Sequence, residues 1–338
     1  MTMSDPIDVD VLSRYLAAHV AGFQGPITLE KFAGGQSNPT FLLSAQSGQY
    51  VLRRQPPGTL LKSAHAVDRE FRVIEALGQT AVPVAKALHL CKDREVIGSL
   101  FYVMSFEQGE IHWDPALRDS SAEKRGAYFD ALLETMAALH NVDVEAAGLA
   151  DYGRAGNYFA RQIDLWTTQY RAAQTGQLDA MEALIAWLPA NCPAESGKPA
   201  LVHGDFRIDN FIFHRGEPRV RAVLDWELST LGNPLADLAY FCMCLRLPRQ
   251  GHIAGLAGLD RAALGIPSEE AMVAQYCRLR GIDAIGHWNF YLAFSFFRLA
   301  SIAQGVKKRA LGGNASNAKA REVGEMAGAL AQMGVDLI

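Results

Sequence analysis

The chain has 338 residues, of which 49% are hydrophobic and 20% charged, so it can bury the core of one bilobal unit or of two domains. Its formal net charge of −4 gives no electrostatic reason to expect nucleic acid or an anionic membrane surface as a partner. Five cysteines without metal-ligand spacing favour a reducing compartment.

The N-terminal residues indicate no export signal. Asp5, Asp8 and Asp10 precede any apolar run, whereas a signal peptide needs a basic start followed by an apolar stretch. The most apolar segment, residues 284–297, is interrupted by polar residues such as His287. Because a membrane span needs ~20 mostly apolar residues, we expect a buried helix there, no membrane partner and a cytoplasmic protein.

The first third of the chain is predicted to be rich in strands. Alternating apolar and polar residues between turn-forming residues indicate strands, whereas apolar residues at three- and four-residue spacing indicate helices. Ser63 is a candidate N-cap and Gly78 a candidate C-cap of the second helix. The predicted helices span residues 8–20 and 62–77, and the predicted strands span residues 27–33, 39–45, 49–54, 87–91 and 99–105.

Beyond residue 108 the chain becomes mainly helical, with one strand-like stretch at residues 200–225. We therefore predict an α+β fold in which residues 1–105 form a small antiparallel sheet lobe and residues 106–338 form a larger helical lobe. Ligands usually bind in the cleft between lobes. The predicted helices of the second lobe span residues 123–140, 158–173, 181–188, 235–245, 268–280 and 284–308.

A loop followed by a hairpin carries the strongest chemical signal. Asp205 and Asn210 lie in the pattern H-G-D-x-x-x-x-N, and the hydrophobic stretch after it ends at Asp225. Residues 211–214 and 219–224 are predicted to pair through a tight turn, which brings Asn210 and Asp225 side by side. Their oxygens suit Mg²⁺, and Asp205 is free to accept a hydroxyl proton, so the pattern favours phosphoryl transfer. The alternative is an acidic loop and hairpin without chemistry.

This pattern is similar to the catalytic and metal-binding loops of the aminoglycoside phosphotransferase and kinase-like family, and the similarity covers nearly the whole chain. The resemblance implies a bilobal protein-kinase-like fold, ATP or GTP as phosphoryl donor and a small-molecule acceptor. It implies Asp205 as the catalytic base and Asn210 with Asp225 as Mg²⁺ ligands. The segments that resemble most closely the kinase domain fused to some acyl-CoA dehydrogenases are residues 52–58, 158–162, 202–210 and 225–229.

A candidate phosphate-covering loop lies between the first two predicted strands, although most such clusters are plain turns. Its candidate nucleotide-binding residues are Gly34, Gly35, Ser37 and Asn38. The loop would complete the nucleotide-binding role that the resemblance implies for residues 1–105.

On the predicted strand 49–54, alternation places Val51 and Arg53 on one face. The resemblance puts Val51 over the nucleotide base and Arg53 where most branches have a phosphate-contacting lysine, and arginine can also fork onto phosphate. Glu70 lies within the apolar stripe of the following helix, where a carboxylate is costly unless paired. Arg53 is therefore its expected partner, and the alternative is that Glu70 reaches solvent at the edge of the stripe.

Residues 101–107 resemble the strand and hinge that hold the nucleotide base, with Met104 beside it. By family analogy, the adenine bonds the backbone carbonyl of Ser105 and the backbone amide of Glu107. The second lobe would then hold the catalytic loop, the metal site and the acceptor pocket.

Four polar residues outside the motif need an interpretation. Asp237 is expected near a helix N-terminus, where the dipole stabilises a carboxylate, and the family uses this acid to brace the catalytic loop. We expect His203 to orient that loop through hydrogen bonds. His112 and His140 have no partner spacing, so core or surface roles are expected for them.

The segments expected to shape the acceptor pocket, residues 152–188 and the helices after residue 245, are rich in basic side chains. This favours an anionic acceptor, such as a hydroxy acid or its coenzyme A thioester, over a cationic aminoglycoside, although exposed basic residues are common. The alternatives are an aminoglycoside-modifying enzyme and a nucleotide-binding pseudokinase scaffold. A protein kinase is disfavoured because no Ala-Pro-Glu motif or activation segment follows Asp225. The basic residues include Arg154, Arg161, Arg171, Arg246, Arg298 and Lys307.

Overall fold

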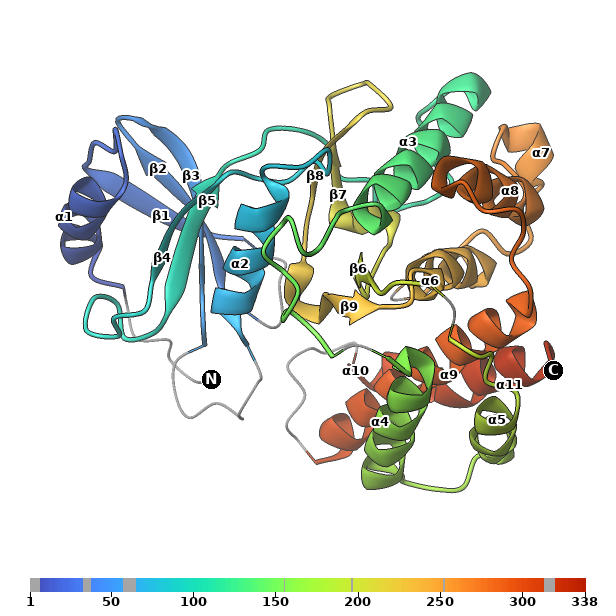
Figure 1. The fold of residues 1–338 in the computed structure, drawn as a ribbon. Helices are drawn as coiled ribbons and strands as arrows, with labels where there is room; N and C mark the ends of the chain where they lie inside the picture. The colour runs from blue at the N-terminus through green and yellow to red at the C-terminus, as the bar shows by residue number, and fades with distance from the viewer. Residues whose placement is uncertain are drawn as a thin grey trace.

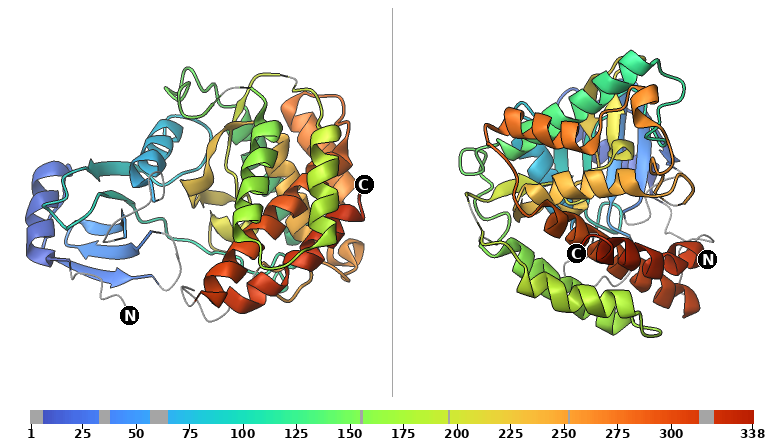
Figure 2. Two further views of the ribbon diagram at one scale, coloured as in Figure 1. Left: turned by 90° about the horizontal axis from the view of Figure 1, so that it is seen from below. Right: turned by 90° about the vertical axis from the view of Figure 1, so that its right-hand side faces the viewer.

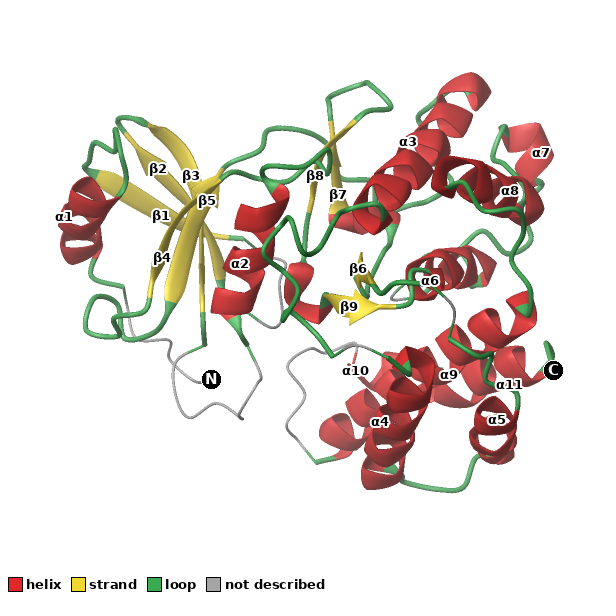
Figure 3. Ribbon diagram, viewed as in Figure 1, coloured by secondary structure: helices red, strands yellow, loops and turns green. Residues whose placement is uncertain are grey.

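The computed structural model describes residues 7–32, 38–56, 65–154, 156–195, 197–251, 253–312 and 320–338. An antiparallel sheet with two helices forms the N-terminal part, and the C-terminal part consists of helices and two short β-ribbons that lie on its side toward the sheet (Figure 1). Figure 3 shows the long strands gathered on one side of the molecule and most helices on the other. The predicted α+β class is confirmed. No helix of the described chain has both the length and the apolar character that crossing a bilayer requires.

The N-terminal part contains α1 (Val9–His19), β1 (Ile27–Lys31), β2 (Thr40–Ala45), β3 (Gly48–Arg54), α2 (Val67–Leu77), β4 (Ala87–Cys91) and β5 (Phe101–Ser105). Its strands are antiparallel in the order β1-β2-β3-β5-β4. Because side chains alternate along a strand, Leu52 and Val103 join the core beneath α1, while their neighbours Val51 and Met104 join the core that contains α2. Figures 1 and 2 show α1 on the outer side of the sheet and α2 toward the helical part.

The C-terminal part contains α3 (Ala122–His140), α4 (Tyr158–Ala173), α5 (Asp179–Ala190), β6 (Ala200–Val202), η1 (Ile208–Asn210), β7 (Phe211–Phe213), β8 (Val220–Val223), η2 (Trp226–Leu228), β9 (Thr230–Gly232), α6 (Leu235–Arg246), α7 (Arg261–Leu264), α8 (Glu269–Arg280), α9 (Trp288–Leu311), α10 (Ala320–Glu325) and α11 (Ala327–Val335). The predicted hairpin is present as β7 paired with β8, and β6 pairs with β9. The long apolar helix α9 packs against α4, α6 and α11, and it lies between α6 and α4 (Figure 2).

Several predicted boundaries differ from the structure. Helix α2 begins at Val67, and the predicted N-cap Ser63 lies outside the described residues, whereas Gly78 is the C-cap as predicted. The helix expected from residue 284 begins only at Trp288, because His287 has a positive φ of 55° that a right-handed helix cannot accommodate. The strand β9 and the helices α7, α10 and α11 were not predicted.

Candidate active site

The predicted catalytic loop follows β6 and is fixed by the start of α6. Asp237, in the first turn of α6, accepts hydrogen bonds from the backbone amides of His203 (2.6 Å) and Gly204 (2.8 Å). Gly204 has a φ of +84°, and a Cβ at this position would lie 2.7 Å from the carbonyl oxygen of Leu228, so the loop requires glycine here. The contact that the resemblance implies for Asp237 is therefore present.

Two histidines complete the support of this loop. His203 Nδ1 accepts from the backbone amide of Asp205 (3.2 Å) while its Nε2 faces the carbonyl oxygen of Leu224 (2.7 Å). An amide can only donate and a carbonyl can only accept, so these contacts fit a neutral ring with its proton on Nε2. His140 lies 3.2 Å from Asp237, a contact that the sequence did not predict. Burial lowers the pKa of His140, so its ring is also neutral near pH 7.

Asp205 lies in the loop with its side chain 18% exposed. The Nε of Arg207 is 3.1 Å from one carboxylate oxygen, and Asn210 Nδ2 donates to the other (3.1 Å). Burial by itself would raise the pKa of Asp205, but the charges of Arg207 and Arg298, together with Tyr240, hold that pKa below its usual value. The carboxylate is therefore ionised at neutral pH, the state that a proton acceptor needs. Neither Arg207 nor Tyr240 was among the predicted site residues, although Arg207 lies within the motif.

The hairpin places Asn210 and Asp225 at the same end, as predicted. Phe211 pairs with Val223, and the amide of Leu224 donates to the carbonyl of Asn210 (2.8 Å). Asp225 has a positive φ of 61°, an uncommon conformation that often marks functional positions, and its side chain is 36% exposed. The amide oxygen and the carboxylate are both ligands that Mg²⁺ prefers, so the donor set fits this ion.

The ion pair expected between Arg53 and Glu70 is confirmed. Arg53 Nε lies 2.8 Å from Glu70 Oε2 and Glu70 is 2% exposed, so the carboxylate does not reach solvent. Glu70 also accepts hydrogen bonds from Asn38 (2.6 Å) and Tyr102 (3.2 Å). Burial raises the pKa of Glu70, and the charge of Arg53 partly offsets this. The terminal nitrogen of Arg53 reaches Asp225 at 3.0 Å, which connects the sheet with the hairpin.

The other predicted nucleotide-binding residues lie on or near this face of the sheet. Val51 and Met104 are register partners on β3 and β5, so they can contact one ligand together. Ser105 Oγ donates to Glu107 Oε1 (2.6 Å), and Arg221 on β8 pairs with the same carboxylate (2.8 Å), which ties the hinge to the hairpin. Asn38 is fully buried against Glu70. The remaining loop residues Gly34, Gly35 and Ser37 lie outside the described residues.

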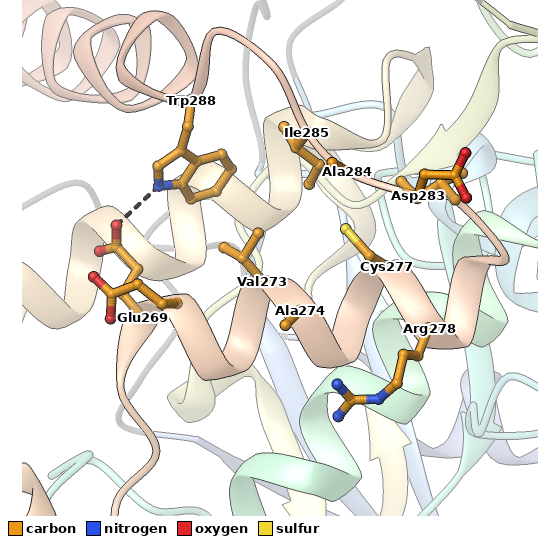
Figure 4. A pocket seen from close by; sticks show the side chains of 11 residues that line it. Glu269, Val273, Ala274, Cys277, Arg278, Asp283, Ala284, Ile285 and Trp288 are labelled. Carbon is orange, nitrogen blue, oxygen red and sulfur yellow. Dashed lines mark hydrogen bonds between the residues drawn. The ribbon is translucent and has the colours of Figure 1, made fainter.

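Several cavities lie among the described residues of the helical part, and two of them bear on the predicted site. The one in Figure 4, of about 520 Å³, lies between α8 and the start of α9, and none of the predicted site residues lines it. Its Glu269 is held by Arg246 (2.7 Å) and by the indole of Trp288 (2.8 Å). A cavity of about 190 Å³ is lined by Arg207 and Asp209, so this smaller space lies beside the catalytic loop.

Comparison with known sequences gives matches along most of the chain. A model described as the phosphotransferase enzyme family matches residues 28–276. Acyl-CoA dehydrogenase family member 10 of Mus musculus is 46% identical over 332 residues, which cover 98% of this chain and 31% of that protein. The probable acyl-CoA dehydrogenase IBR3 of Arabidopsis thaliana is 45% identical over 354 residues, covering 98% of this chain and 43% of that protein. The chain thus spans less than half the length of these relatives.

Solved structures show the same arrangement. A candidate aminoglycoside phosphotransferase from Ralstonia eutropha superposes with a TM-score of 0.91 at 46% identity, covering 98% of each chain. The aminoglycoside phosphotransferase APH(4)-Ia, in a ternary complex with ADP and hygromycin B, has a TM-score of 0.62 at 17% identity over 96% of this chain and 98% of that one. At such low identity the second likeness concerns the fold alone.

Proposed function

The chain belongs to the phosphotransferase enzyme family and has the kinase-like fold of the aminoglycoside phosphotransferases, and from this premise we propose that it transfers the terminal phosphoryl group of ATP (or GTP) to a hydroxyl of a small molecule. One observation carries the proposal. An ionised Asp205 lies in a loop whose backbone is braced by Asp237, next to Asn210. The same hairpin presents Asp225, so a proton acceptor and oxygen ligands occur in one place.

In this proposal the two parts of the chain have separate tasks. Residues 1–105 bind the nucleotide: Val51 and Met104 contact the base, the backbone of Ser105 and Glu107 bonds it, and Arg53 contacts phosphate together with the loop of Gly34, Gly35 and Ser37. Asn38, which is buried against Glu70, supports that loop instead of contacting phosphate. Residues 106–338 hold the acceptor and the catalytic groups.

The chemistry follows from the catalytic loop. Asp205 accepts the proton of the acceptor hydroxyl as the hydroxyl oxygen attacks the terminal phosphorus, and the bond from that phosphorus to the bridging oxygen breaks, so that the nucleoside diphosphate leaves. The loop contacts keep the carboxylate in position. Asn210 and Asp225 would hold Mg²⁺, which neutralises charge on the phosphates when bound. Positioning and charge neutralisation account for most of the rate in phosphoryl transfer.

We further propose that the acceptor is anionic, for example a hydroxy acid or its coenzyme A thioester. Some of the basic residues counted in the sequence are already neutralised, because Arg171 pairs with Glu182 and Arg246 pairs with Glu269. Arg298 is different, since it is buried near Asp205. An aminoglycoside acceptor, as in the complex of APH(4)-Ia with hygromycin B, is the second candidate, and a non-catalytic nucleotide-binding scaffold is the third.

The test is a phosphoryl-transfer assay with Mg²⁺ and γ-labelled ATP. A panel of hydroxy acids and hydroxyacyl thioesters is compared with kanamycin. We expect label transfer to an anionic compound and none to kanamycin, and a fall of roughly 10²–10⁴-fold in Asp205→Ala with Mg²⁺–ADP binding retained. The matched control Asp130→Ala changes an exposed acid on α3 and should keep wild-type turnover. Near-wild-type turnover in Asp205→Ala would remove the assigned base, and transfer to kanamycin alone would remove the anionic acceptor.

A further inference from the structure

Arg298 on α9 is a buried arginine whose guanidinium group makes no ion-pair contact with a carboxylate in the described part of the chain. It is 8% exposed, and within the described chain it has neither a hydrogen bond nor an ion pair. Other buried charges are satisfied: Glu70 pairs with Arg53, and Asp237 accepts two backbone amides. Because burying a charge is costly unless it is paired, this arginine requires an explanation beyond packing.

Its surroundings leave the guanidinium donors free. The guanidinium carbon lies 5.0 Å from the ring centre of Tyr240 on α6 and 5.5 Å from that of Trp166 on α4. Aromatic rings stabilise the positive charge through the face of the guanidinium group. Its five N–H donors point outward in the plane of the group, so stacking does not satisfy them. These donors can therefore bind a ligand that accepts hydrogen bonds.

The location is next to the proposed chemistry. Tyr240, which lies against Arg298, and the charge of Arg298 both help to lower the pKa of Asp205. Arg298 therefore lies close to the proton acceptor on the side of the helical part. The nucleotide side already has Arg53, which comes from β3.

We propose that Arg298 binds an oxyanion of the acceptor, a carboxylate or a phosphate, and so holds the acceptor hydroxyl against Asp205. This inference rests on the proposed phosphoryl transfer and adds the residue that selects an anionic acceptor. The terminal phosphate of the nucleotide is also an oxyanion, so it is the alternative ligand of Arg298. The acceptor is the favoured source because Arg298 comes from α9, in the helical part, where α4 and α6 meet it.

The experiment measures binding rather than turnover. Wild type, Arg298→Met, Arg298→Lys and the control Arg278→Met, which changes an exposed arginine on α8, are each saturated with Mg²⁺–ADP. Short- to medium-chain 3-hydroxy acids and the matched neutral 1,3-diols are then titrated by calorimetry, and Mg²⁺–ATP is titrated separately. Arg298→Met should weaken acid binding by on the order of 10- to 100-fold, the effect of losing charge-assisted hydrogen bonds. Diol and Mg²⁺–ATP affinities should not change, and Arg278→Met should match wild type.

Arg298→Lys decides the question if Arg298→Met does not fold. Lysine keeps the charge over the rings but lacks the planar fork, so acid affinity should fall by roughly 3- to 10-fold. The proposal would be overturned if the folded variants kept the acid affinity of wild type, or if the acids did not bind wild type. It would also be overturned if the variants lost affinity for Mg²⁺–ATP instead of the acids.

The two proposals can fail separately. Acid binding that depends on Arg298, without transfer of phosphate in the labelled-ATP assay, would leave this site standing and remove the kinase function. If phosphate is transferred to an acid that Arg298→Met binds as tightly as wild type does, the kinase function stands and the proposed role of Arg298 is removed.

Discussion

Arg53 shows why arginine, rather than the more common lysine, can occupy this position. Its Nε lies 2.8 Å from Glu70, and another nitrogen of the same group lies 3.0 Å from Asp225 and 3.6 Å from Glu227. A lysine carries one nitrogen on a flexible stem, whereas the planar guanidinium can hold acids on two edges at once. Burial by itself would lower the pKa of Arg53, but Glu70 and the other acids raise it, so the side chain stays charged.

Removing this arginine should therefore be costly to stability. Arg53→Met leaves Glu70 buried without its counter-charge, and breaking a buried pair from one side typically costs about 3–5 kcal/mol. We expect a loss of that order in the free energy of unfolding, measured by urea titration. Adding Glu70→Gln to this variant should recover part of it, because the stranded charge is gone.

The control for that experiment is Arg72→Met. Arg72 pairs with Asp151 at the surface, where both side chains are exposed, so its removal should cost no more than about 1 kcal/mol. Equal losses in the two single variants, or no recovery in the double variant, would contradict the idea that Glu70 depends on Arg53.

Among the helices, α3, α6 and α8 together support the catalytic loop. Asp237 on α6 holds the loop amides, His140 on α3 contacts Asp237 (3.2 Å), and Tyr276 on α8 contacts the other nitrogen of His140 (2.8 Å). Each donor in this series of hydrogen bonds has an acceptor when His140 is neutral with its proton on Nε2. A second proton on that ring would leave a hydrogen-bonding group of the buried network without a partner, which is costly to stability.

This arrangement predicts a pH dependence of stability. The folded pKa of His140 is lowered by burial, so the folded state binds this proton more weakly than the unfolded chain, where histidine has a pKa of about 6.5. The stability that the neutral His140 ring contributes to the folded state is therefore present above about pH 6.5, and it is lost as the pH falls below that value. Between pH 7.5 and 5.5 the free energy of unfolding should fall more for wild type than for His140→Gln. His214→Gln, in the hairpin turn, should keep the wild-type slope, and an unchanged slope in His140→Gln would refute the assignment.

How far the sequence predicts elements depends on their length and pattern. The helix expected at residues 158–173 agrees with α4 (Tyr158–Ala173), because sixteen residues give several turns of apolar spacing. The strand β9 (Thr230–Gly232) has three residues, too few for alternation to be recognised. Helix α11 (Ala327–Val335) is rich in alanine and glycine, so it lacks a stripe of large apolar residues.

Contacts in the site are likewise predictable only where they depend on short-range patterns in the sequence. Arg53 with Glu70, and Asn210 with Asp225, were paired from the sequence because strand alternation, a helical stripe and a hairpin are short-range rules. Arg298 could not be placed next to Asp205 in this way. It comes from α9, and its position depends on how distant helices pack.

At the scale of the whole molecule, α2 joins the sheet to the helical part. Arg69 of α2 donates to the carbonyl of Tyr152 (2.9 Å) and stacks over its ring at 4.2 Å. The pair between Arg53 and Asp225 adds a second connection, from β3 to the end of the hairpin. A ligand that contacts both parts should therefore raise the stability of both parts together.

The last prediction tests that link through the proposed metal site. If Asn210 and Asp225 share Mg²⁺, adding Mg²⁺–ADP at about 100 times its Kd should stabilise wild type by about 2.7 kcal/mol through mass action. Asp225→Ala should lose most of the Mg²⁺-dependent rise in Tm. Its ligand-free stability should change by no more than about 1 kcal/mol, because its pair with Arg53 is partly exposed. Asp151→Ala also removes an exposed partner of an arginine and should keep the full rise. If Asp225→Ala keeps that rise as well, the metal is bound elsewhere.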